Sequence, residues 1–234
     1  MYFKVSEEFF RLFPTACFGI VIAKEVNNNQ TREEINQLLL QSIAEKEKAF
    51  SEVKVKEHPS ILIWRAAFQK LGYNPNKFPS SIEAMSSRIA KGGKLPLIND
   101  VVNLINALSL KYLLPMGAHD LDIMEGDIQL TFTDGSYPFT PFGMEETESV
   151  EAGELVYRDS LEVRTRKWVW RQGNKAKITQ ESQTIFFPID GFSDFNLEKV
   201  LTARDELAEL LKRHFAVEVK CSFVDKNNRE TLIL

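Results

Sequence analysis

The stretch from Ser87 to Asp122, SRIAKGGKLPLINDVVNLINALSLKYLLPMGAHDLD, combines a helix, its cap and a polar cluster. Between residues 99 and 111, apolar residues recur at helical spacing and gather on one side: Val101, Leu104, Ile105 and Leu108. Asn99, Asn103 and Asn106 fall on the opposite side. Asn99 is expected to cap this helix, because its side chain can accept a hydrogen bond from a free backbone N–H.

The two asparagines inside the helix, Asn103 and Asn106, have two interpretations. Asn is a poor residue for a helix interior because its side chain competes for backbone hydrogen bonds. In the first interpretation the two amides are structural and face solvent or hold a loop. In the second they face a polar pocket.

The same stretch carries a resemblance to a known family. The residues that match are Arg88, Pro96, Ile98, Asn99, Val101, Val102, Asn106, Pro115, Ala118, Asp120, Leu121 and Asp122. Their order resembles the signature that opens the B3/B4 module of the bacterial phenylalanyl-tRNA synthetase β subunit. The resemblance covers residues 82–188 and implies a free-standing relative of that module.

The length and composition are those of an ordinary globular protein. The chain has 234 residues, of which 44% are hydrophobic and 26% charged. No apolar run reaches the roughly 18 residues of a membrane span, and charged residues interrupt the N-terminal stretch where a signal peptide would be apolar. We expect a cytoplasmic protein without a membrane partner.

Periodicity and turn residues predict helices before strands. The expected helices are 31–50, with Thr31 and Glu34 as a capping box, 59–71, 80–90, 99–111 and 196–214. The expected strands are 17–23, 127–133, 137–142, 155–157, 161–170, 184–188 and 216–224. This order predicts one compact α+β domain over residues 1–234, of the synthetase-module type, with helices of the N-terminal half packed on a β-sheet.

The charges have an uneven distribution. A net charge of −4 argues against a protein that covers nucleic acid with basic surface, and we expect no DNA partner. Acids concentrate in 116–162, whereas bases concentrate in 65–94 and 164–177. Either these bases form one face that docks an RNA backbone, or each is simply solvated. The candidate RNA-binding residues are Arg65, Arg88, Lys91, Lys94, Arg166, Lys175 and Lys177.

A second informative stretch is RTRKWVWRQGNKAKIT, residues 164–179. Alternation in a strand would put Arg166, Trp168 and Trp170 on one face. The tryptophans are either half-buried sheet residues or platforms that stack a base or an aminoacyl ring. Together with the asparagine helix and its following loop, this stretch supplies the candidate substrate-binding residues, which are Asn103, Gly117, Trp170, Arg171, Gln172 and Thr179.

The resemblance implies editing, in which the module hydrolyses the ester of wrongly charged tRNA. Asn106 matches the pocket asparagine of the family. Three other pocket positions differ. Ile105 stands where the family has a threonine, Gly117 stands where it has a histidine, and Pro188 lies near the position of the family glutamate that recognises the substrate hydroxyl. His119 lies two residues beyond the lost histidine, and it either takes over its place or serves as a surface or capping residue.

Two functions follow from these residues. The first is a trans-acting hydrolase of mischarged aminoacyl-tRNA, with Asn106 and His119 as catalytic residues and the aminoacylated acceptor end of tRNA as partner. The second is a non-catalytic module that binds RNA or an aminoacyl-like ligand. A protein-interaction domain that uses the acidic residues is a third possibility. We expect no metal and no cofactor, because the cysteines and histidines lack ligand spacing.

Overall fold

Strand β2 (Ala16–Ala23) runs through the middle of the protein, whose computed structural model describes residues 1–234. All of its residues are buried, as its apolar sequence predicts. Because side chains alternate across a strand, Phe18 and Ile20 enter one hydrophobic core, whereas Val21 enters a second. The strand β2 therefore separates two cores.

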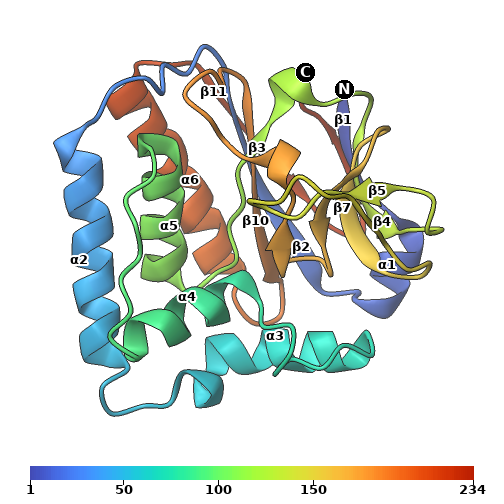
Figure 1. Cartoon of the computed structure of the whole chain (residues 1–234), viewed down its shortest axis with the longest axis horizontal. Coiled ribbons are helices and arrows are strands. Elements are labelled where there is room, and N and C mark those ends of the chain that lie inside the picture. Colours follow the sequence, from blue (N-terminus) through green and yellow to red (C-terminus); the bar gives the residue numbers. More distant parts are fainter.

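A four-stranded antiparallel sheet contains β2. Its order is β11 (Val219–Val224), β2, β10 (Ile185–Phe192) and β3 (His119–Asp120). Helix α6 (Leu197–Phe215) packs on this sheet (Figure 1). Gly19 allows the close approach, since a Cβ at this position would lie 3.1 Å from Val200 Cγ1 of the helix. The C-terminal strand β11 thus pairs directly with β2, which lies near the N-terminus of the chain.

A six-stranded sheet packs against the other face of β2. Its order is β12 (Glu230–Leu232), β1 (Tyr2–Val5), β4 (Ile128–Phe132), β7 (Leu155–Arg158), β8 (Val163–Arg166) and β9 (Arg171–Gln172). The pair β1 and β4 is parallel and the other neighbours are antiparallel. Phe3 of this sheet contacts Phe18 of β2 with ring centroids 5.8 Å apart. A separate two-stranded sheet joins β5 (Pro138–Phe139) to β6 (Glu148–Ser149).

The remaining helices come from the N-terminal half. They are α1 (Glu7–Leu12), α2 (Glu33–Ala49), α3 (Pro59–Lys70), α4 (Ser81–Ala90) and α5 (Asp100–Tyr112). Three short 3-10 helices also occur, at Val55–Glu57, Leu121–Ile123 and Asn174–Ala176. Helix α5 packs between α2 and α6, while α3 and α4 lie below the sheets (Figure 1). The α+β prediction, with N-terminal helices packed on β-sheet, is confirmed.

The predicted capping box at the start of α2 is wrong. Arg32, not Thr31, occupies the N-cap and makes no side-chain cap. The Arg32 backbone N–H instead donates to Asp100 Oδ2 at 2.9 Å, and its guanidinium pairs with the same carboxylate at 3.0 Å. An acid at the start of α5 therefore orders the start of α2, which no local motif could reveal.

The predicted strand 161–170 is also wrong in its second half. Strand β8 ends at Arg166, and the next two residues, Lys167 and Trp168, have left-handed φ values of 47° and 65°. The chain then returns as β9. Trp168 is consequently buried in the core, whereas Trp170 is half-buried, and the two indoles do not share a strand face.

The asparagine helix, α5, keeps its predicted cap. The Val102 N–H donates to the Asn99 side chain at 3.0 Å. Asn103 is buried and structural, because its oxygen accepts from the Ile98 N–H and its nitrogen donates to Asn36, both at 2.9 Å. The interpretation that Asn103 faces a pocket is therefore wrong. Asn106 is half-buried, and its side chain makes no hydrogen bond within the protein.

The two asparagines of α5 predict different effects on stability. Asn103→Ala leaves the Asn36 amide and the Ile98 N–H without partners, so the free energy of unfolding should fall by about 1–3 kcal/mol. Asn106→Ala should change it by less than about 0.5 kcal/mol, because this side chain has no partner to lose. Urea denaturation of both variants checks the pair, and equal losses would contradict the assignment of Asn103 as the structural residue.

Candidate functional site

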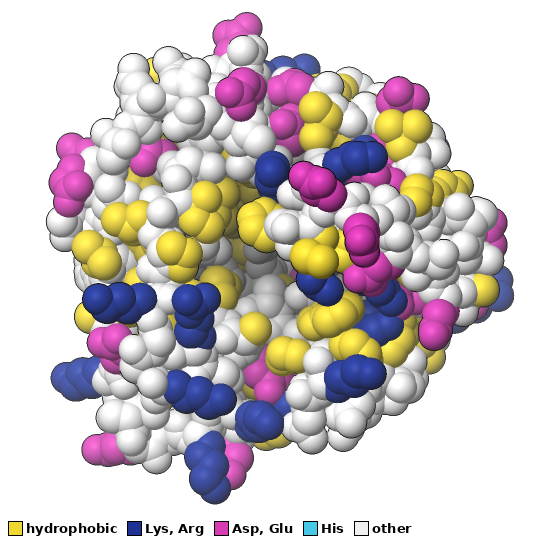
Figure 2. Space-filling model, in the orientation of Figure 1, with side chains coloured by type: hydrophobic (Ala, Val, Ile, Leu, Met, Phe, Trp, Pro, Cys, Tyr) yellow, Lys and Arg dark blue, Asp and Glu magenta, His cyan; other side chains and the backbone are white.

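Two adjoining cavities flank the segment that carries β9. The outer cavity lies between this segment and α5, and the inner cavity lies between this segment and β10, among buried side chains. The inner cavity measures about 100 Å³ and the outer cavity about 440 Å³. Five residues line both cavities, and they are Met116, Gly117, Trp170, Arg171 and Gln172. Figure 2 shows a hollow at the centre of this face, with hydrophobic side chains around it. One continuous site therefore has an inner and an outer compartment.

The outer cavity receives one wall from α5. Asn106 and Ile105 line this wall, together with Val102 and with Ile98 from the preceding loop. Phe142 and Lys177 also line this cavity. Because the amide of Asn106 has no partner in the protein, it is free to bind a ligand. The asparagine of the helix and the cationic strand residues thus meet at one hollow.

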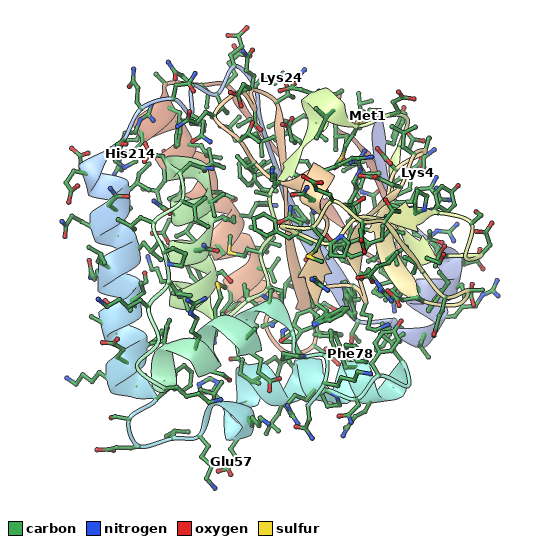
Figure 3. All side chains as sticks on the ribbon, in the orientation of Figure 1. Met1, Lys4, Lys24, Glu57, Phe78 and His214 are labelled. Carbon is green, nitrogen blue, oxygen red and sulfur yellow. The ribbon has the colours of Figure 1, made fainter.

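The left-handed turn after β8 positions the second wall. It sends Trp168 into the core and returns the chain so that Trp170 and Arg171 line both cavities. Trp170 packs edge-on against Phe78, with ring centroids 4.7 Å apart, and Phe78 is labelled to the lower right of the centre in Figure 3. Arg171 makes no ion pair or hydrogen bond through its guanidinium, so its charge is available to a ligand.

Gln172 is fixed in place by its amide nitrogen. Its Nε2 donates to the carbonyl oxygens of Ala118 and Ala176, at 2.8 and 3.0 Å. These bonds leave the side-chain oxygen of Gln172 without a partner in the protein. An ordered acceptor is therefore held beside the free guanidinium of Arg171.

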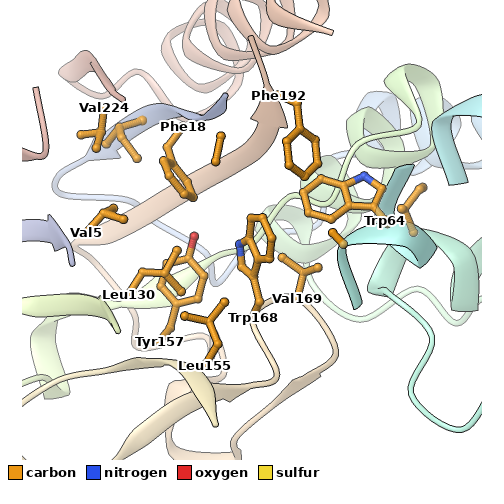
Figure 4. Close-up of a cluster of buried hydrophobic side chains, with 14 of the residues drawn as sticks. Val5, Phe18, Trp64, Leu130, Leu155, Tyr157, Trp168, Val169, Phe192 and Val224 are labelled. Atoms are coloured by element: carbon orange, nitrogen blue, oxygen red, sulfur yellow. The ribbon is translucent and has the colours of Figure 1, made fainter. Parts of the chain in front are cut away.

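The floor of the inner cavity contains Asp190 of β10. Its Oδ1 accepts hydrogen bonds from the Tyr157 hydroxyl at 2.8 Å and from Trp168 Nε1 at 2.7 Å. Figure 4 shows the Tyr157 hydroxyl and the Trp168 nitrogen directed into the same space. Burial raises the pKa of Asp190 to about 7, although these two hydrogen bonds oppose the shift. No group of the protein donates to Asp190 Oδ2.

His119 lines the inner cavity from β3 and is buried. Its Nδ1 has no hydrogen-bond partner. Burial lowers the pKa of His119 to about 3, and the charge of Arg164 adds to this effect. The ring is therefore neutral at ordinary pH and is a weak proton acceptor. A Cβ at Gly117 would lie 3.4 Å from His119 Nε2 and 3.3 Å from Pro188 Cγ, so Gly117 keeps this wall open.

Asp190 was not among the residues selected from the sequence. It lies two residues beyond Pro188, in the run IFFPIDGF of 185–192, and it is the only charged residue of that buried strand. A lone acid inside an apolar strand was the available signal, since burying a charge is costly unless the charge is paired and hydrogen-bonded.

Several selected residues lie away from the cavities or are already paired. Thr179 lines neither cavity, and it belongs instead to a loop in which its N–H donates to Ser182 Oγ at 2.9 Å.

Arg65 pairs with Glu83 at 2.6 Å, and Arg166 pairs with Glu154 and Glu148 at 2.8 Å each. Lys175 pairs with Glu162 at 3.1 Å. Of the two interpretations of these bases, the one in which all of them form a single face for RNA is therefore wrong, because several are paired with acids.

Four selected cations have no ion-pair partner, and they are Arg88, Lys91, Lys94 and Lys177. All four are exposed. Lys and Arg side chains gather over α3 and α4 below the hollow, whereas acids are more frequent above and to its right (Figure 2). A smaller basic surface than the sequence predicted thus lies beside the site.

Nowhere do three or more His, Cys, Asp or Glu side chains gather in a way that could hold a metal ion. None of the helices combines the length and the apolar character that crossing a membrane requires.

Asp190 predicts a pH-dependent difference in stability between the protein and its Asp190→Asn variant. The carboxyl holds its proton up to about pH 7 when folded, but only up to about pH 4 when unfolded. The protonated carboxyl contributes to the free energy of unfolding below pH 4. This contribution is lost as pH rises through 7, and the loss is roughly 4 kcal/mol at most. The variant should therefore gain stability relative to the parent across this window.

Unfolding in urea at a series of pH values measures this difference. Asn keeps an oxygen that can accept from Tyr157 and Trp168, so the fold is retained. His119 has the opposite effect, because its lowered pKa gives stability above its ordinary pKa that is lost as pH falls towards 3. Since both proteins contain His119, its contribution cancels. A difference that stays constant from pH 4 to 7 would show that Asp190 ionises normally.

Comparisons with known proteins identify the family. A search of curated proteins found no match. The chain is similar in structure to an N-terminal fragment of the phenylalanyl-tRNA synthetase β-subunit from Pyrococcus horikoshii, with a TM-score of 0.50 and 12% identity. That match covers 93% of this chain and 49% of the fragment, so the chain spans about half of the fragment's length. The family model of the B3/4 domain matches residues 63–216, and the chain belongs to the B3/4 domain family.

Proposed function

We propose that this protein binds the aminoacylated 3′ end of a tRNA and hydrolyses the ester of a mischarged tRNA in trans. The observation that carries this proposal is the junction of the two cavities at Arg171. An aminoacyl group in the inner cavity and the terminal nucleoside in the outer cavity would put the ester linkage at that junction.

The tRNA part of the proposal is supported by the family and the fold. The B3/4 domain model matches about two thirds of the chain, and the similar solved structure is a fragment of a tRNA synthetase subunit. At 12% identity this likeness concerns the fold alone, so the choice of ligand depends on the site. The site offers a free amide, a free guanidinium and exposed cations, which suit a nucleotide end.

The hydrolytic part requires little from the protein. An ester is already activated, so orientation and polarisation of its carbonyl supply most of what the reaction needs. In this proposal Arg171 polarises the carbonyl oxygen, and Asn106 with the Gln172 oxygen orients the ribose and the attacking water. Water adds to the carbonyl carbon, the ester C–O bond breaks, and the ribose oxygen leaves with a proton.

His119 has a limited role in this mechanism. Its pKa of about 3 makes the imidazole a poor general base at neutral pH. We propose that it donates or accepts a hydrogen bond at the wall of the inner cavity while it stays neutral. The same weakness favours the second candidate function, a module that binds the aminoacyl end without hydrolysing it.

A deacylation assay tests the function. Arg171→Ala and Asn106→Ala should each lower the rate of amino-acid release from mischarged tRNA by about tenfold to 1,000-fold, because each removes a group that stabilises the transition state. The assay measures release of labelled amino acid from a panel of mischarged tRNAs under single-turnover conditions.

Asn103→Ala is the matched control for this assay. It alters the same helix but not the cavities, so at a temperature where it is folded its rate should equal that of the parent. Binding without release at any tRNA would favour the non-catalytic module. Release that both Arg171→Ala and Asn106→Ala leave unchanged would place the reaction elsewhere.

The exposed cations predict salt-dependent binding. Replacing Lys91, Lys94 and Lys177 together by Ala should weaken tRNA binding and flatten its dependence on salt, since each phosphate contact contributes about one unit to the slope of log affinity against log salt. Filter binding at several salt concentrations measures this slope. The paired Arg65→Ala serves as a comparison with a small expected effect, and binding without salt dependence would remove RNA from the proposal.

A further inference from the structure

We propose that the inner cavity selects a small amino acid with a free amino group, whose ammonium binds Asp190 and whose carbonyl lies beside Arg171. The inference rests on the proposed function for placing the nucleoside in the outer cavity. It adds the class of substrate that the protein accepts.

Asp190 lacks a partner that an ammonium group would supply. Its Oδ1 already accepts two hydrogen bonds, from Tyr157 and Trp168, and its Oδ2 accepts none. A buried carboxylate without a charged partner is unfavourable, so a cationic ligand gains from entering this cavity. Tyr157, Trp168 and Trp170 line the same cavity, and aromatic rings beside a carboxylate suit an ammonium ion.

The order of charges along the site matches an aminoacyl group. Asp190 lines only the inner cavity, whereas Arg171 lines both cavities. An α-amino ester carries its ammonium and its carbonyl on adjacent carbon atoms. With the ammonium at Asp190, the carbonyl points outward towards the free guanidinium, and the ester oxygen continues into the outer cavity.

The volume of the inner cavity limits the side chain. A cavity of about 150 Å³ holds a benzene molecule, and the inner cavity has about 100 Å³ for the ammonium, Cα and side chain together. Trp168, Tyr157 and Pro188 form its walls. A phenyl ring therefore does not fit, whereas the side chains of glycine, alanine and serine do. Ser81 and Thr165 also line the cavity, and their hydroxyls make no hydrogen bond within the protein.

Non-hydrolysable ligands test this selection without any need for catalysis. The probes are amides of 3′-amino-3′-deoxyadenosine that carry alanyl, seryl, phenylalanyl or N-acetylalanyl groups, with the unloaded nucleoside as control. Calorimetric titration of the full chain should show alanyl and seryl amides binding at least about tenfold tighter than the unloaded nucleoside. The phenylalanyl and N-acetylalanyl amides should show no such gain.

Two variants separate charge from size. Asp190→Asn should abolish the gain from the alanyl group while leaving the affinity for the unloaded nucleoside unchanged. Trp170→Leu should improve binding of the phenylalanyl amide by about tenfold, because it removes part of the wall that the two cavities share. Thermal unfolding of each variant shows whether it is folded before titration.

The outcomes distinguish this inference from the proposed function. Phenylalanyl or N-acetylalanyl amides that bind as tightly as alanyl amide overturn the inference, even if the protein deacylates tRNA. Failure of every probe to bind overturns it as well. Selective binding of the small amides without release of amino acid from any tRNA supports the inference and overturns hydrolysis.

Discussion

The hydrogen bonds from Tyr157 and Trp168 to Asp190 join three parts of the chain that are distant in sequence. Asp190 belongs to the four-stranded sheet, Tyr157 to the six-stranded sheet, and Trp168 to the turn after β8. All three side chains are buried, so losing either bond would leave a buried polar group unpaired at a cost of about 1–3 kcal/mol. The packing of the two sheets therefore fixes the floor of the inner cavity. The Oδ1 atom of Asp190 accepts the hydrogen bonds that join the sheets, and its Oδ2 atom has no donor within the protein.

The turn at Lys167 and Trp168 is the least favourable local conformation of the site. Two consecutive non-glycine residues in the left-handed region cost roughly 1–2 kcal/mol each. Buried interactions on both residues offset this cost. Lys167 pairs with the buried Glu154, and the Trp168 ring packs on Phe9 and Trp64 with centroids 4.9 and 5.0 Å apart. The positions of Trp170 and Arg171 are thus set by contacts made by the residues immediately before them.

Much of the fold was readable from the sequence, because helical spacing, capping by Asn99 and the apolar run of β2 are local signals. The cavity walls were partly readable, since Asn106, Gly117, Arg171 and Gln172 line the cavities. Features that depend on distant partners were not. The alternation of 164–170 predicts a continuous strand. The left-handed turn at Lys167 and Trp168 depends on the burial of the Trp168 ring among distant residues, which the local sequence does not show. Likewise Arg166 and Arg65 look free in the sequence, but each pairs with an acid that lies 12 or 18 residues away.

The pairing of these bases bears on the RNA binding that we propose. Arg166, Lys167 and Lys175 are largely neutralised by nearby acids, so they add little to the field outside the protein. Among the cations without ion-pair partners, Lys91 and Lys94 lie on the loop after α4, and Lys177 lines the outer cavity. The net charge of −4 gives the chain no general attraction for a polyanion. Surface charge would then orient an RNA end towards the cavities, while the choice among ligands would depend on the uncharged walls and on Asp190.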